Sequence, residues 1–196
     1  MNELARPGSL VLAVCGASGQ IYARAVLKVA ARNNLPVDLI LSANAVAVAA
    51  EELDGHDLDS GLNARIRRHP NLNLHSPLAS GSHRTAGMII CPCTLNTLGA
   101  LASGLSDNLI RRAAQVHLKQ RRPLVLALRE TPLGLIDLEN LAKLARAGAV
   151  AAPLCPPFYH KPQTIEQLVD YTAERLVDLI HPIPLSFTYT GNLSHE

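Results

Sequence analysis

The sequence predicts a single α/β domain in which a parallel β-sheet carries helices on both faces. Short apolar runs alternate with helix-like segments along most of the 196 residues, and this alternation is typical of β–α–β units. The apolar runs are continuous, as expected of strands that are covered on both sides. Two of the runs lead directly into small and polar residues, at 16–19 and at 91–98. Sheets of this class bind their ligands at such strand ends.

The first half of the chain predicts two strand–helix pairs. In chain order, these strands and helices cover Leu10–Val14, 21–31, Val37–Leu41 and 43–53. The first helical segment is rich in Ala and has apolar residues at helical spacing. Residues 55–80 are polar, with repeated Asn, His and Arg. We expect them to form a variable excursion with one short strand at 72–74.

The second half predicts three further strands, each followed or preceded by a helix. The strands are expected at 88–91, Leu124–Leu128 and 149–152, and the helices from within 99–104, at 109–120, at 138–147 and at 164–180. Gly148 is a predicted C-cap, and Thr164 is the predicted N-cap of the last helix. We expect the whole chain, 1–196, to form one domain that ends in an irregular tail, 181–196.

The composition excludes several classes of protein. Hydrophobic residues make up 48% of the chain and charged residues 17%, so we expect part of the surface to be buried between subunits; an Ala- and Leu-rich monomer is the alternative. The net charge is only +2 and there is no Trp, which argues against nucleic acid as a partner. The sequence has no apolar run of about 18 residues for a membrane span and no signal-peptide pattern at its start.

The four cysteines favour a reducing compartment. Cys15, Cys91 and Cys93 lie at or near predicted strand ends, where small buried apolar residues are common. The Cys91–Cys93 spacing has no second pair and no matching His cluster, so we expect no metal site. Together with Cys155, this cysteine usage predicts a cytoplasmic protein without disulfides.

Gly16-Ala17-Ser18-Gly19 is a candidate cofactor-binding turn. It is shorter than the G-x-G-x-x-G fingerprint of dinucleotide sites and therefore favours a mononucleotide. A plain strand-to-helix turn explains it equally well. Ser42, at the end of the second predicted strand, is either a phosphate donor or a simple helix cap. With the turn at 91–98, these features suggest a phosphate-bearing cofactor that lies across the strand ends.

Charged residues gather near two other predicted boundaries. Arg129 and Glu130 directly follow a buried strand, which places both at the ligand-binding edge of the sheet. We interpret them as functional residues rather than as a structural ion pair. Arg111, Arg112 and the cationic segment 119–122 fit either a solvated helix face or a phosphate site.

The proline-rich loop 156–162 is a further candidate region. Three prolines flank Phe158 and Tyr159, so the loop is stiff enough to present Tyr159 to a site; a rigid connector whose aromatic residues cover the core is the alternative. His160 is compatible with an ordinary surface histidine. Arg175, in the last predicted helix, is a second candidate phosphate ligand or a solvated arginine.

These blocks, in this order and spacing, resemble the flavin prenyltransferase family of the UbiX/Pad1 type over about residues 10–180. The most specific parts are the Gly-Ala-Ser-Gly turn, Cys91-Pro92-Cys93, Asn108 to Ala114, Leu118 to Leu126, Arg129-Glu130-Thr131-Pro132 and Phe158-Tyr159. The resemblance implies a flavodoxin-like or Rossmann-like subunit of a dodecamer with sites at subunit boundaries. It also implies transfer of a dimethylallyl group from dimethylallyl monophosphate to reduced FMN, making prenylated FMN for UbiD-type decarboxylases.

The resemblance further implies a role for individual residues. Those assigned to FMN are Gly16, Ala17, Ser18, Ser42, Thr94, Asn96, Thr97 and Arg112. Those assigned to the phosphate of the isoprenoid substrate are Lys119, Arg129, Tyr159 and Arg175, and such a cationic cluster stabilises a departing phosphate. Glu130 is assigned to proton transfer, with Ser18 and Glu52 supporting the reacting end of the flavin. No metal is required by this scheme.

The chain departs from the family pattern at several positions. Gln20 replaces a small residue, Thr94 replaces Ser, and Gln115 replaces an acidic residue. The tail lacks the Arg-Trp pair of many members, so Phe187 or Tyr189 is expected to cover the site instead.

Two other functions fit parts of the sequence. Residues 92–97 loosely resemble the Pro-Ala-Ser-Ala-Asn-Thr turn of FMN-binding decarboxylases of cysteine-type thiols, which need a catalytic His; His75 and His83 precede the turn. A non-enzymatic flavin carrier, or an accessory subunit of an aromatic-acid decarboxylase, would keep the FMN contacts. It would not need the four phosphate-binding residues together.

Overall fold

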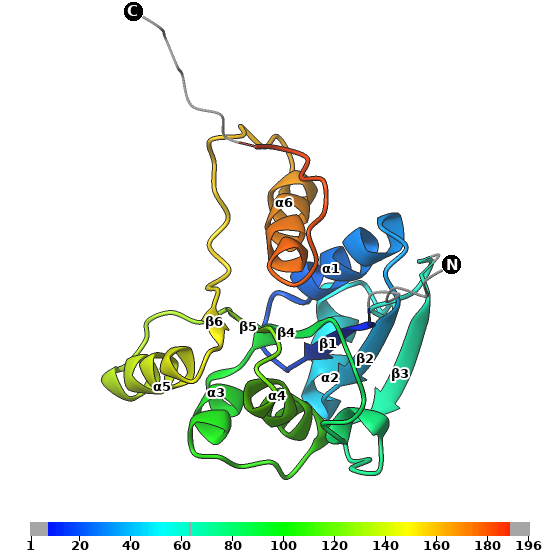
Figure 1. Ribbon diagram of the computed structural model, residues 1–196. Coiled ribbons are helices and arrows are strands. Elements are labelled where there is room, and N and C mark those ends of the chain that lie inside the picture. The colour runs from blue at the N-terminus through cyan, green and yellow to red at the C-terminus, as the bar shows by residue number, and fades with distance from the viewer. Residues whose placement is uncertain (1–7, 63, 189–196) are drawn as a thin grey trace, which may run out of the picture.

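The protein folds around one six-stranded sheet in which all neighbouring strands are parallel (Figure 1). The computed structural model describes residues 8–62 and 64–188. The strands are β1 (Leu10–Val14), β2 (Val37–Leu41), β3 (Ile66–Pro70), β4 (Gly87–Cys93), β5 (Leu124–Leu128) and β6 (Val150–Ala151). The helices are α1 (Gln20–Arg32), α2 (Ala43–Glu52), α3 (Leu95–Ala102), α4 (Leu109–Lys119), α5 (Leu135–Arg146) and α6 (Ile165–Asp178), with a 3₁₀ turn, η1, at Pro77–Ala79.

The strand order is β3-β2-β1-β4-β5-β6, the doubly wound order of nucleotide-binding sheets. Leu12 of β1 pairs with Leu39 of β2 on one side and with Ile89 of β4 on the other. After β1 the chain winds outward to β2 and β3, and only then returns to β4. The direction of winding therefore reverses between β1 and β4, and a crevice opens where their carboxyl ends separate.

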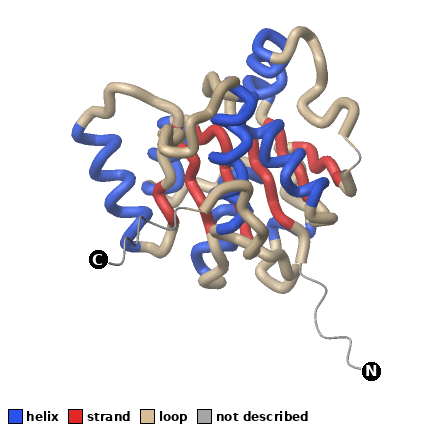
Figure 2. Tube along the Cα trace, turned by 90° about the horizontal axis from the view of Figure 1, so that it is seen from above, coloured by secondary structure: helices blue, strands red, loops and turns tan. Residues whose placement is uncertain are grey.

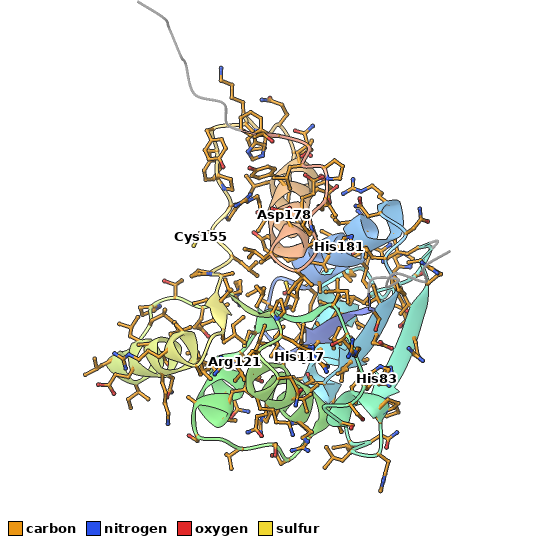
Figure 3. All side chains as sticks on the ribbon, viewed as in Figure 1. His83, His117, Arg121, Cys155, Asp178 and His181 are labelled. Carbon is orange, nitrogen blue, oxygen red and sulfur yellow. The ribbon has the colours of Figure 1, made fainter. Side chains whose placement is uncertain are left out.

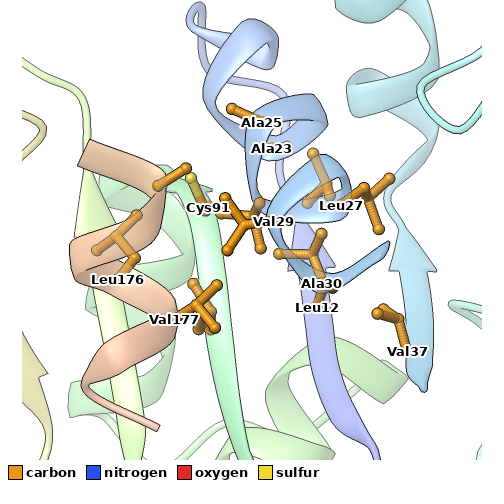
Figure 4. Packing of buried hydrophobic residues seen from close by; sticks show 14 of the residues in the cluster. Leu12, Ala23, Ala25, Leu27, Val29, Ala30, Val37, Cys91, Leu176 and Val177 are labelled. Atoms are coloured by element: carbon orange, nitrogen blue, oxygen red, sulfur yellow. The ribbon is translucent and has the colours of Figure 1, made fainter. Parts of the chain in front are cut away.

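Helices cover both faces of the sheet (Figure 2). On one face, Leu12 and neighbouring apolar residues pack against α1 and α6; Val29, Leu176 and Val177 gather there around Cys91 (Figure 4). On the other face, the alternate residues of β1 and β4 pack against α3, α4 and α5. This two-sided burial explains why the strands read as unbroken apolar runs.

Five of the six strands and all the long helices were predicted, but the edge strand was not. The prediction of a strand at 72–74 is wrong: those residues form a turn, Leu72 is 86% exposed, and the strand lies earlier, at β3. Arg67 and His69 of β3 bond to the buried Asp38 of β2, at 2.7 and 2.8 Å. Polar side chains thus fasten this edge, and no apolar run marks it.

The carboxylate of Asp38 is held in its charged form. Burial would raise the pKa of Asp38, but hydrogen bonds from Ser9, His69 and Arg67 outweigh it and hold the pKa below its usual value. The attachment of β3 to β2 is therefore ionic as well as hydrogen-bonded.

Two boundaries near β4 also differ from the prediction. The strand was expected to end at Cys91, yet Pro92 and Cys93 also belong to β4 and are buried. The following helix, α3, does not begin within 99–104 but at Leu95, because the Thr94 hydroxyl accepts from the backbone N–H of Thr97 and caps it. Small residues such as Gly99 instead lie inside the helix, where they permit close packing.

A long arm connects β6 to α6 and stands away from the sheet (Figure 1). Cys155 lies on this arm (Figure 3) and is exposed. Phe158 on the arm is 72% exposed, and Leu135 and Ile136 at the start of α5 are 72% and 74% exposed. α5 itself begins three residues earlier than predicted, at Leu135. The arm and the start of α5 thus each expose apolar side chains, a feature typical of surfaces that contact another protein.

Among the described residues, no helix is long and apolar enough to cross a membrane. The tail has no regular structure over residues 181–188, and the predicted cover residue Tyr189 lies outside the described residues. Phe187 does contact Tyr159, with ring centroids 5.4 Å apart.

Candidate functional site

A cavity of about 300 Å³ opens at the carboxyl ends of the central strands. It is lined by Cys15, Gly16, Ser42, Ala43, Asn44, Asn71, Thr94, Asn96, Thr97, Asn108, Ile110 and Arg111. These residues come from the segments that follow β1, β2, β3 and β4 and from the start of α4. The cavity therefore lies at the reversal point of the sheet, where the fold predicts a ligand.

Three helices begin at this cavity. Ser42, Thr94 and Asn108 line it, and their side chains accept from backbone N–H groups of α2, α3 and α4, respectively. The remaining N–H groups of each first turn carry partial positive charge toward the cavity. This arrangement favours an anionic ligand such as a phosphate. Ser42 and Thr94 are both predicted site residues, and each of them caps a helix and also lines the cavity.

Gly16 allows the turn after β1 to approach α2. A Cβ at Gly16 would lie 2.4 Å from the Cβ of Asn44, a distance that no side chain tolerates. The close approach keeps Gly16 on the wall of the cavity, beside Cys15.

Asparagine side chains supply much of the polar lining, and the sequence analysis missed three of them. Asn71 accepts from the backbone N–H groups of Leu109 and Ile110, through its backbone and side-chain oxygens, at 2.7 and 3.1 Å. It thereby ties the end of β3 to the start of α4. Asn44 and Asn108 also line the cavity. Asn44 follows the predicted strand at 37–41 and Asn108 precedes the predicted helix at 109–120, and these positions were their only signals. Asn71 was missed because β3 was misplaced.

Cys15 contributes an uncharged thiol to the wall. Its Sγ lies 3.3 Å from Oγ1 of Thr97, and burial raises the pKa of the Cys15 thiol. Burial likewise raises the pKa of Cys91 and Cys93 within β4. None of these thiols is therefore placed to act as a thiolate nucleophile.

Two adjacent arginines have different surroundings. Arg111 lines the cavity, bonds to Asp107 at 2.7 Å and leaves its buried Nε without a partner among the described residues. The hydrogen bonds from Arg111 hold the pKa of Asp107 below its usual value. Arg112, the predicted FMN ligand, instead donates from Nε to the backbone oxygen of Ala79 at 3.0 Å. Arg111 is thus the arginine that faces the cavity.

The turn after β1 gathers several predicted residues. Arg129 donates from Nε to the backbone oxygen of Ser18 at 2.9 Å. Glu52 accepts from the backbone N–H groups of Gly19 and Gln20, at 2.9 and 2.7 Å. Ser18, Glu52 and Arg129 therefore meet at one turn, although they lie far apart in the sequence.

Glu130 follows Arg129 and is exposed; its Oε1 accepts from the backbone N–H of Thr131 at 3.1 Å. Its carboxylate is accessible at the ligand-binding edge of the sheet, directly after β5. This position suits a group that exchanges protons with a ligand.

Tyr159 and Arg175 line a different cavity, of about 250 Å³, between the arm and α6. It shares no lining residue with the first cavity. The hydroxyl of Tyr159 lies 3.3 Å from that of Tyr171, and Arg175 forms an ion pair with Asp178 at 3.7 Å. One chain thus brings Tyr159 and Arg175 together, but apart from the first cavity.

Lys119 is exposed at the far end of α4. That helix begins at the first cavity, and its 11 residues extend about 15 Å away, toward the amino ends of the strands. Lys119 and Arg129 are therefore separated within one chain, and the predicted phosphate-binding group is not assembled by a single subunit. Among residues 8–62 and 64–188, no group of three or more His, Cys, Asp or Glu could hold a metal ion.

Comparison with known proteins identifies the family of this chain. Residues 2–177 match the Flavoprotein family model. The flavin prenyltransferase UbiX of Aquifex aeolicus (strain VF5) is 41% identical over 175 residues, which cover 87% of this chain and 92% of that protein.

Solved structures give the same result. A structure of AnUbiX (PadA1) in complex with FMN and dimethylallyl pyrophosphate has a TM-score of 0.84 and 40% identity, covering 89% of this chain and 93% of that one. A dodecameric FMN-dependent UbiX-like decarboxylase from Escherichia coli O157:H7 has a TM-score of 0.79 and 33% identity, covering 87% and 93%. The peptidyl-cysteine decarboxylase EpiD shares only the fold, at 11% identity and a TM-score of 0.60. The chain belongs to the flavin prenyltransferase UbiX family.

Proposed function

We propose that this protein is a flavin prenyltransferase, which transfers the dimethylallyl group of dimethylallyl monophosphate to reduced FMN. The product is prenylated FMN, to be used by a UbiD-type decarboxylase. The observation that carries the proposal is the cavity at the carboxyl ends of the strands, where three capped helices begin beside the Ser18 turn. It offers hydrogen bonds and positive potential to the phosphate and polar edges of a flavin nucleotide.

The residues proposed to hold FMN are Gly16, Ala17, Ser18, Ser42, Thr94, Asn96, Thr97 and Arg112. Five of them line the cavity, and Arg111 joins them as the arginine that faces it. The charge of Arg111 and the N–H groups of the helices would neutralise the flavin phosphate.

The bound flavin supplies the nucleophilic nitrogen and one face of the pocket; the protein binds, orients and neutralises. Lys119, Arg129, Tyr159 and Arg175 are proposed to bind the phosphate of the isoprenoid substrate. As the bond from the allylic carbon to the phosphate oxygen breaks, negative charge grows on the leaving phosphate. Fixed cations stabilise that charge more than they stabilise the starting ester, which lowers the barrier.

Glu130 is proposed to move the proton that accompanies closure of the new ring, at the exposed end of β5. Ser18 is proposed to donate a hydrogen bond from its hydroxyl at the reacting edge. Glu52 supports this edge indirectly, because it fixes the backbone N–H groups of Gly19 and Gln20.

Assembly is part of the proposal. Lys119 lies near the amino ends of the strands, whereas Arg129 follows the carboxyl end of β5. Tyr159 and Arg175 line a separate cavity. We propose that neighbouring subunits of a homododecamer bring these groups to one site, with the apolar arm and α5 at the contacts. The cytoplasm is the proposed location, on the cysteine usage of the sequence.

Anaerobic incubation with reduced FMN and dimethylallyl monophosphate tests the function. Mass spectrometry of the released flavin should show the mass of one added isoprenyl unit. Tight binding of unmodified FMN would instead favour a flavin carrier or a decarboxylase of cysteine-type thiols.

A further inference from the structure

Gln20 holds the turn after β1 from inside the protein. It is the first residue of α1 and is fully buried. Its Nε2 donates to the backbone oxygens of Cys15 and Ala17, at 2.9 and 2.8 Å. Two carbonyl oxygens beside one amide nitrogen fix the orientation of the side chain, since only its NH₂ group can donate.

These two hydrogen bonds determine where other backbone groups point. In a planar trans peptide, the C=O and the following N–H point in opposite directions. Because Gln20 draws the oxygens of Cys15 and Ala17 inward, the N–H groups of Gly16 and Ser18 are directed away from it. Gly16 lies on the wall of the first cavity.

Three other backbone groups of the turn are already bonded. The oxygen of Ser18 accepts from Arg129, the oxygen of Gly19 accepts from Tyr22, and the N–H of Gly19 donates to Glu52. Among the hydrogen bonds between described residues, none uses the N–H of Gly16 or Ser18. The turn therefore directs the N–H groups of Gly16 and Ser18 away from Gln20, while the oxygens of Cys15, Ala17, Ser18 and Gly19 are bonded within the protein.

Gln20 leaves one of its own polar atoms unpaired. Its Oε1 is buried and has no hydrogen-bond partner in the described structure. An unpaired buried acceptor destabilises a folded protein, so the Gln20 amide costs stability at its oxygen while its nitrogen bonds two carbonyl oxygens of the turn. The benefit of this amide therefore lies in its NH₂ group, which fixes the backbone of the turn.

We propose that Gln20 is a positioning residue, which aims the N–H groups of Gly16 and Ser18 at hydrogen-bond acceptors of FMN. This inference rests on the proposed flavin site. It assigns a role to a side chain that contacts the turn rather than the ligand.

The test compares Gln20→Met and Gln20→Ala with Asn33→Ala as a matched control. Met keeps the length of Gln20 and removes the unpaired Oε1, but it leaves the oxygens of Cys15 and Ala17 without this donor, so the melting temperature should fall. Flavin binding is therefore compared at a temperature at which every variant is folded. The side-chain amide of Asn33 donates a similar hydrogen bond, from Nδ2 to the backbone oxygen of Val29 at 2.9 Å, at the other end of the same helix. Calorimetric titration gives the dissociation constant of FMN, and the absorption spectrum of bound FMN reports its surroundings.

We expect both Gln20 variants to raise the dissociation constant of FMN about tenfold, as loss of preorganised hydrogen bonds would, and to shift the spectrum of bound FMN. Asn33→Ala should change neither. An FMN affinity and spectrum in Gln20→Met equal to those of the unmodified protein would overturn the proposal, as would equal weakening by Asn33→Ala. If Met prevents folding, the Ala variant decides in the same way. If the unmodified protein fails to bind FMN, the proposed function fails first and this inference with it.

Discussion

The two cavities of this chain differ in how complete they are. The first cavity, at the carboxyl ends of β1 and β4, is built by one subunit: helix caps, asparagine amides and Arg111 all face it. The second, beside the arm, holds Tyr159 and Arg175 next to exposed apolar side chains. Under the proposed function, we expect one subunit to supply most of the flavin contacts and neighbouring subunits to complete the site for the isoprenoid phosphate.

The largest effect is expected from Glu130→Gln. The amide cannot take up or release the proton, so formation of the finished product should fall by roughly 10²–10⁴-fold. Binding of FMN should stay within about twofold, because Glu130 is not part of the first cavity. Product analysis by mass spectrometry and flavin titration measure the two quantities, and full turnover would rule out the role assigned to this carboxylate.

The second prediction tests whether subunits share the isoprenoid site. Lys119→Ala and Arg175→Ala should each lower turnover by about 10²-fold, because each removes a charge from the leaving phosphate. Oligomers that contain both variants should regain activity, since some of their sites would combine an intact Lys119 with an intact Arg175. The variants are mixed after dissociation and reassembled, and each variant reassembled alone is the control. No recovery would place both residues in the site of one chain.

Assembly itself provides the third prediction. Ile136→Glu puts a charge on the exposed apolar start of α5, where Ile136 is 74% exposed. Burying that charge in a contact is costly, so light scattering should show smaller species and turnover should fall by about tenfold or more. FMN affinity should persist. A similar substitution at exposed Leu72, in the turn after β3, is the control. An unchanged assembly would remove α5 from the subunit contacts.

The fold was largely predictable because most of its strands are buried and form continuous apolar segments of the sequence. Leu10–Val14, Val37–Leu41 and Leu124–Leu128 are apolar throughout, and burial on both faces produces that signal. β3 lacked it, since an edge strand such as Ile66–Pro70 keeps polar side chains and is fastened by a carboxylate of β2, Asp38. The misplaced strand then concealed the cavity residue that follows it.

The candidate site was predictable only in part. The resemblance pointed to Thr94 and Thr97, and the structure places both on the first cavity. It also pointed to Arg112, while Arg111 faces the cavity; neighbouring helix residues point about 100° apart, and the sequence alone does not settle which one faces inward. Residue types alone did not reveal the separation of Lys119 from Arg129, because it depends on the end of the strands at which each residue lies.

These two arginines supply the fourth prediction. Arg111→Ala should weaken FMN binding by roughly tenfold to a hundredfold, as loss of a charge-assisted hydrogen bond would. Arg112→Ala should have a smaller effect, transmitted through its bond to the oxygen of Ala79. Parallel flavin titrations of the two variants measure the difference. A larger loss in Arg112→Ala would restore the assignment drawn from the resemblance.

The smallest expected effect concerns the stability of the sheet and its helices rather than either cavity. His117 on α4 is buried (Figure 3); its Nε2 lies 2.8 Å from Oγ1 of Thr85, and its Nδ1 donates to the oxygen of Ala113 at 2.7 Å. Burial lowers the pKa of His117 to about 4, so the folded protein keeps this ring neutral while the unfolded chain protonates near its ordinary value of 6.5. The unfolded state therefore binds more protons as the pH falls below 6.5, and stability decreases until about pH 4.

Between pH 7 and pH 5.5 this difference should cost about 1 kcal/mol of unfolding free energy. Urea unfolding at the two pH values measures it, and His117→Gln, which cannot titrate, should lose most of the pH dependence. FMN affinity should be the same in both proteins at pH 7, because His117 does not line the first cavity. An equal pH dependence in His117→Gln would assign the acid sensitivity to other groups. Loss of FMN binding in that variant would instead show that the packing of α4 and the cavity at its N-terminus are coupled.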